Sequence, residues 1–116
     1  MFQKLIIAGN LGGDPTMKFT PDGKAVTTFS VAVSTRKDET VWFRVTVWGA
    51  QAETAEKYLH TGAKVLVEGR LQADAATGNP RVFERKDGTM GASFEVTADY
   101  FRFLSGKEET VEEIPY

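Results

Sequence analysis

Residues 41–48 alternate strictly between two kinds of side chain, and this alternation predicts a β-strand with two different faces. One face is an ordinary apolar core face of three valines and Phe43. The other face carries Trp42, Arg44, Thr46 and Trp48. Because indoles are costly to leave in water, this face is either buried by another layer or subunit, or kept open for flat ligands such as unpaired bases. The strand alone leaves both interpretations open.

A single helical segment interrupts a chain that otherwise has the pattern of β-strands. Residues 50–60 place apolar side chains at helical spacing, and Thr61-Gly62 is a helix stop signal. Three strands are predicted before the helix and two after it, with a long loop or hairpin near residues 72–92; the strand segments are 2–8, 26–34, 41–48, 65–71 and 94–104. This order predicts an all-β OB-fold, a five-stranded Greek-key barrel with one short helix between strands three and four.

Two features refine this order. Residues 17–20 form a possible short strand before the turn Pro21-Asp22-Gly23-Lys24, and we assign it to the first strand. Asp87-Gly88 predicts a hairpin turn within residues 81–90.

The chain of 116 residues is long enough for one core, which we place in residues 1–104, followed by a short acidic tail at 105–116. Of 14 basic and 16 acidic residues, one lysine and four glutamates lie in the tail, which leaves 13 and 12 in residues 1–104. Binding of a polyanion must therefore depend on local placement of charge. The tail ends in Glu112, Glu113, Ile114, Pro115 and Tyr116. It is either a solvated end or a segment that docks into a partner protein.

The inventory of reactive side chains argues against catalysis. The chain has no cysteine and one histidine, His60, and no carboxylate pair stands out as an acid and a base. We therefore expect no enzyme, no metal site and no cofactor. No apolar run reaches membrane-spanning length and no signal peptide is evident, so we expect no membrane contact and a cytoplasmic location.

Cations and aromatic rings also gather outside residues 41–48. Arg36 and Lys37 precede that strand, and the predicted hairpin carries a second group, namely Arg81, Phe83, Arg85 and Lys86. Each group alone is typical of a solvated loop. Together with the Trp42 face they predict a groove that follows a single nucleic-acid strand.

Several segments in the right order resemble the bacterial single-stranded DNA-binding protein (SSB) family, over residues 2–104. They are 4–15 (KLIIAGNLGGDP), 42–49 (WFRVTVWG), 56–59 (EKYL) with Gly62, and 67–71 (VEGRL). The resemblance implies an OB-fold, sequence-independent binding of single-stranded DNA and a homotetramer.

The resemblance also implies a set of site residues. The family stacks bases on four aromatic positions. In this chain Trp42, Trp48 and Phe83 match three of them. The fourth falls near Lys37, so one ring is missing or another, such as Phe19, replaces it. The candidates for phosphate contact are Arg36, Lys37, Arg44, Arg70, Arg81, Arg85 and Lys86.

The tail resembles the family's acidic tip, in which aspartates precede Ile-Pro-Phe; here glutamates and Tyr116 take those places, after an unusually short linker. The resemblance implies a protein of the nucleoid that coats single-stranded DNA in replication, repair and recombination, and whose tip, residues 112–116, recruits genome-maintenance proteins. The alternative is an OB-fold module for replication restart or protein interaction with weak DNA binding.

Overall fold

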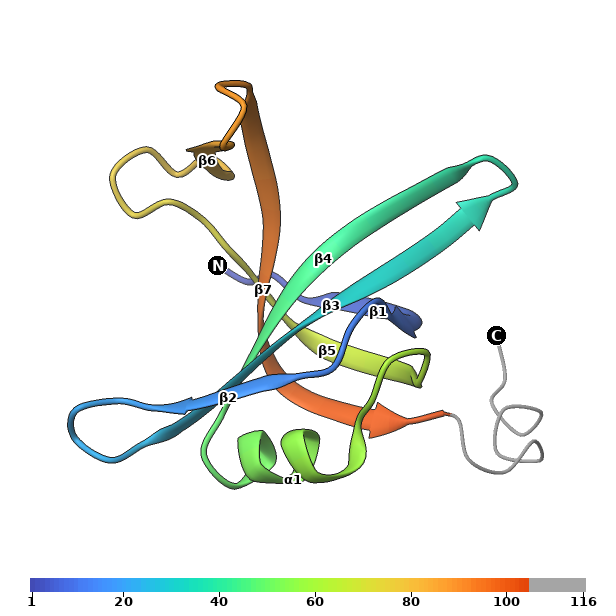
Figure 1. Cartoon of the computed structure of the whole chain (residues 1–116), viewed down its shortest axis with the longest axis vertical. Helices are drawn as coiled ribbons and strands as arrows, with labels where there is room; N and C mark the ends of the chain where they lie inside the picture. Colours follow the sequence, from blue (N-terminus) through green and yellow to red (C-terminus); the bar gives the residue numbers. More distant parts are fainter. Residues whose placement is uncertain (105–116) are drawn as a thin grey trace.

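The structure is a computed structural model and describes residues 1–104 (Figure 1). It contains one helix, α1 (Ala50–Tyr58), within that range. The strands are β1 (Leu5–Leu11), β2 (Thr16–Phe19), β3 (Ala25–Arg36), β4 (Glu39–Trp48), β5 (Lys64–Gln72), β6 (Arg81–Glu84) and β7 (Met90–Phe103). The predicted tail tip, residues 112–116, lies outside the described residues. No helix in residues 1–104 is long and apolar enough to cross a membrane.

Five strands close into a barrel in the order β1-β5-β7-β4-β3, and β1 pairs with β3 to complete the ring. All neighbours are antiparallel except β4 and β7, which run parallel. Helix α1 connects β4 to β5, the third and fourth strands of the barrel in chain order. The predicted OB-fold is therefore confirmed.

The two short strands, β2 and β6, each pair with one strand of the barrel. The assignment of residues 17–20 to the first strand is wrong, because β2 forms a hairpin with β3. The turn between them closes with a hydrogen bond from the Thr20 N–H to the Lys24 carbonyl, and Gly23 supplies the required positive φ of 90°. Strand β6 pairs with the first four residues of β7. Because of this pairing, β7 begins at Met90, four residues before the predicted start of the last strand.

The barrel interior is filled mainly by β-branched side chains. Six valines are fully buried: Val31, Val45, Val47, Val65, Val67 and Val96. Helix α1 covers one end of the barrel, at the bottom of Figure 1, and buries Ala52 and Ala55. The buried Thr27 hydroxyl donates a hydrogen bond of 2.7 Å to the Ala52 carbonyl. The helix is thus tied to β3 by both packing and a polar contact.

Closure of the ring requires a residue without a side chain on β1. A Cβ atom on Gly9 would lie 2.1 Å from the carbonyl oxygen of Ala32 on β3. The next residue, Asn10, is the point at which β1 passes from its pairing with β5 to its pairing with β3. Because the neighbour is backbone, no side-chain rotation can relieve this contact.

We predict that Gly9→Ala lowers the free energy of unfolding by about 1–3 kcal/mol, the usual cost of forcing extra atoms into a packed site. Urea denaturation followed by circular dichroism measures this. The matched control is Gly13→Ala, because a Cβ on Gly13 meets nothing within 4 Å. Equal stability of the two variants would show that the β1–β3 contact does not limit closure.

Candidate nucleic-acid interface

Strand β4 presents its two tryptophans on the outside of the barrel. The buried Val45 and Val47 alternate with an outward-facing row that is 52% exposed at Trp42 and 44% exposed at Trp48. Arg44, between them, is also exposed. Within residues 1–104 no second layer covers this face, because α1 lies over the end of the barrel instead.

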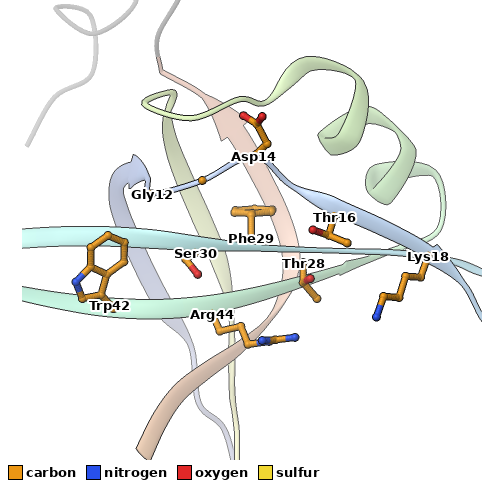
Figure 2. A pocket seen from close by; sticks show the side chains of 10 residues that line it. Gly12, Asp14, Thr16, Lys18, Thr28, Phe29, Ser30, Trp42 and Arg44 are labelled. Atoms are coloured by element: carbon orange, nitrogen blue, oxygen red, sulfur yellow. The ribbon is translucent and has the colours of Figure 1, made fainter. Parts of the chain in front are cut away.

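A groove of about 530 Å³ runs along this face across three strands (Figure 2). Figure 2 shows Trp42 at one side, Lys18 at the other and Arg44 between them. The polar floor comes from paired strands, since Ser30 is opposite Arg44 and Thr28 is opposite Thr16. The remaining lining residues are Gly12, Gly13, Asp14 and Phe29.

The two cations of the groove have no acidic partner among residues 1–104. Neither Arg44 nor Lys18 forms an ion pair or a side-chain hydrogen bond there. Asp14, the acidic residue of the lining, is engaged elsewhere: its carboxylate accepts hydrogen bonds of 2.8 Å from the N–H and the hydroxyl of Thr61. These bonds, the backbone one foremost, hold the pKa of Asp14 below its ordinary value of 3.8.

The Trp42 indole rests against the β1–β2 loop. A Cβ on Gly12 would lie 2.5 Å from the Cζ3 atom and 2.7 Å from the Cη2 atom of the ring. Only a residue without a side chain lets the ring occupy this position. Asp14 in turn anchors the same loop to Thr61, after α1. The loop therefore limits where the indole can lie.

The hairpin of β6 and β7 continues the same face. Arg44 on β4 is opposite Glu95 on β7, and the alternation along β7 places residues 91, 93 and 95 on one side. Phe83 and Arg81 on β6 are opposite Gly91 and Ser93 and thus share that side. Phe83 is half-buried between two guanidinium groups, with Arg81 Cζ at 5.3 Å and Arg85 Cζ at 5.6 Å from the ring centroid.

The remaining predicted cations differ in their surroundings. Arg70 forms an ion pair of 3.3 Å with Asp99, and Arg81 forms one of 2.7 Å with Glu95. Arg85 donates a hydrogen bond of 2.6 Å to the Met90 carbonyl. The other three lie away from the groove lining at exposed positions, Arg36 at the end of β3 and Lys37 and Lys86 in turns.

The groove contains one cation that the sequence did not single out, Lys18, and does not contain Phe19, which the sequence offered as one of two possibilities for the fourth ring. Residues on β2 alternate, so Lys18 and Thr16 face the groove while Phe19 lies on the opposite face, beside the buried Ala25. Phe19 therefore does not replace the missing fourth ring on this face. The signal for Lys18 is the pairing of β2 with β3, which the sequence analysis had not assigned.

The sequence of this chain matches a known protein family. The model of the single-strand binding protein family matches residues 2–104. Proteins named single-stranded DNA-binding protein are similar to the chain: it is 34% identical to that of Neisseria meningitidis serogroup B over 121 residues, 40% to that of Clostridium tetani over 107, and 39% to that of Xanthomonas campestris pv. campestris over 114.

These matches cover 97%, 87% and 91% of this chain. The chain spans 66%, 69% and 62% of the length of the three relatives, about two thirds in each case. A family match over residues 2–104 and relatives at 34–40% identity agree with each other and with the closed barrel. The chain belongs to the single-strand binding protein family.

Proposed function

We propose that this chain binds single-stranded DNA without regard to sequence and that it acts by binding rather than by catalysis. One observation carries the proposal: two exposed indoles flank a guanidinium without an acidic partner in residues 1–104, all on one barrel strand. Every base has a π-face, so stacking on Trp42 and Trp48 tolerates any sequence, while Arg44 attracts the phosphates. The similarity to proteins named single-stranded DNA-binding protein supports the same function.

The proposed path of the strand follows the outer face from β2 to the β6–β7 hairpin. Lys18 and Arg44 contact phosphate first, because neither has to leave an acidic partner in residues 1–104. Phe83 supplies a third stacking ring once one of its two arginines moves aside. Additional phosphate contacts come from the predicted set of Arg36, Lys37, Arg70, Arg81, Arg85 and Lys86. We propose that three rings per subunit, rather than four, stack bases.

We predict that poly(dT) strongly quenches the intrinsic fluorescence of the protein at low salt, because the chain contains two tryptophans and both lie on this face. Trp42→Ala is expected to weaken binding by about 1–3 kcal/mol, the usual loss for one stacking ring. The matched control is Phe19→Ala, which removes a ring that is 63% exposed on the opposite face and should change little. Absence of quenching by poly(dT) at low salt would contradict the proposed function.

We propose further that the chain assembles into a homotetramer. A second groove, of about 510 Å³ and mainly apolar, lies on another side of the barrel. It is lined by Ile6, Ile7, Ala8, Val33, Thr35, Val41, Phe43 and Leu66. Ile6 is 60% exposed there, an arrangement that favours burial against a second copy of this chain, as the resemblance to the family implies.

We predict that native mass spectrometry of the full chain finds a tetramer and that Ile6→Glu shifts it to smaller species, because a charge would be buried without a partner. Phe19→Glu places the same charge on a different exposed apolar residue and should leave the assembly unchanged. A monomeric wild-type protein at micromolar concentration would refute the assembly, but not DNA binding.

In the cell, we propose, the protein works in the cytoplasm at the nucleoid, where it coats and protects single-stranded DNA during replication, repair and recombination. The acidic tip, Glu112 to Tyr116, is proposed to recruit genome-maintenance proteins by docking its apolar end residues into a partner's pocket. The charge of the tip supports a second consequence, since its two glutamates would repel phosphate.

We predict that deletion of residues 112–116 leaves DNA binding intact or makes it tighter, because the deletion removes two negative charges and no proposed DNA contact. Fluorescence titration of the truncated and full chains with oligo(dT) compares them. A variant with Glu112→Gln and Glu113→Gln separates the effect of charge from that of length. Loss of binding on deletion would show that the tip belongs to the DNA site.

A further inference from the structure

Glu95 places a negative charge on the face proposed to bind a polyanion. It is opposite Arg44 of β4 in the parallel ladder and opposite Gln72 of β5 on its other side. Its side chain is only 19% exposed, whereas Arg44 and Trp42 are exposed beside it. A carboxylate in this position opposes the approach of phosphate by Coulomb repulsion.

Glu95 holds Arg81 in place. The Arg81 Nε atom donates a hydrogen bond of 2.7 Å to Glu95 Oε2, and the same guanidinium lies 5.3 Å from the centroid of the Phe83 ring. The Arg81 cation is thus bound to a carboxylate and folded against the ring that is proposed as the third stacking platform. A charge-assisted contact of this length is among the stronger hydrogen bonds in proteins.

The other cations of this face are not restrained by a carboxylate in this way. Arg44 and Lys18 have no acidic partner in residues 1–104, and Arg85 is held by the neutral carbonyl of Met90. Two more ion pairs occur in the described part of the chain, Lys4–Glu68 and Arg70–Asp99, and both are longer, at 3.3 Å. Glu95 therefore acts selectively on the hairpin cation closest to Phe83.

We infer that Glu95 is an internal competitor of phosphate for Arg81 and thereby sets the affinity and the salt dependence of single-stranded DNA binding. This inference rests on the proposed function. A bound strand gains a contact with Arg81 only by displacing the carboxylate. The free energy needed to break the ion pair therefore reduces the free energy gained from that contact. The displaced carboxylate stays near the phosphates and cancels part of the gain. Glu95 is a positioning residue, since it acts on DNA through Arg81.

The test is Glu95→Gln, which keeps the shape of the side chain and removes its charge. With an oligo(dT) of fixed length, we expect binding to tighten by about two- to fivefold, the range expected for releasing an ion pair near the surface. The slope of log K against log[salt] should become steeper by up to about 0.7, the value for one additional phosphate contact on a single strand. The matched control is Glu68→Gln, which frees Lys4, the residue before β1, and should leave the slope unchanged.

A double-mutant cycle with Arg81→Ala isolates the mechanism. The steeper salt slope from Glu95→Gln should vanish when Arg81 is absent, whereas part of the gain in affinity remains, because the charge of Glu95 also repels phosphate directly. Thermal unfolding of each variant confirms that the barrel is intact. An unchanged or weaker affinity of Glu95→Gln would overturn the inference, and so would a steeper salt slope that persists without Arg81. If the wild type binds and quenches normally, these outcomes leave the proposed function standing. If the wild type itself does not bind, the proposed function fails and this inference fails with it.

Discussion

The closing contact between β1 and β3 is the constraint on which the rest of this barrel depends. Strand β1 pairs with β5 along most of its length and reaches β3 only through Asn10 and Leu11. Gly9 makes this possible, because any side chain there would collide with the Ala32 carbonyl. Once the ring is closed, every barrel strand has an inner and an outer face. The inner face of β4 holds the fully buried Val45 and Val47, so Trp42 and Trp48 must face outward.

The position of α1 then determines whether that outer face stays accessible. The helix buries Ala52 and Ala55 at the end of the barrel, where the Thr27 hydroxyl anchors it, and leaves the outer face of β4 uncovered within residues 1–104. Exposed indoles are unfavourable in water, and two of them on one strand mark a surface suited to a ligand. The loop that holds Gly12 against Trp42 and Asp14 against Thr61 limits where one indole can lie, which would lower the entropy cost of the proposed stacking of a base on it.

Sequence patterns predicted the local features of this arrangement and missed the contacts between distant segments. The alternation in residues 41–48 and the helical spacing in residues 50–60 are local properties, so β4, α1 and the order of strands and helix along the chain were predictable. Strand β2 has only four residues, too few for a periodicity, and its pairing with β3, which places Lys18 in the groove, depends on the turn after it. The position of Glu95 was beyond sequence reasoning because it results from the parallel pairing of β4 with β7, whose partners Arg44 and Glu95 are far apart in the chain.

The same distant pairings explain how a nearly neutral barrel can present a cationic groove. Residues 1–104 have almost equal numbers of basic and acidic side chains, so overall charge supplies little attraction for DNA. The cations differ in whether a neighbouring carboxylate neutralises them. Arg70 and Arg81 have carboxylate partners, whereas Arg44 and Lys18 have none among the described residues. Attraction is therefore concentrated in the groove beside Trp42, and the cations toward β5 and the hairpin are partly restrained. In the proposed binding mode, a strand meets the open groove first and the Phe83 hairpin second, where the inferred role of the Glu95 ion pair is to limit the gain in affinity.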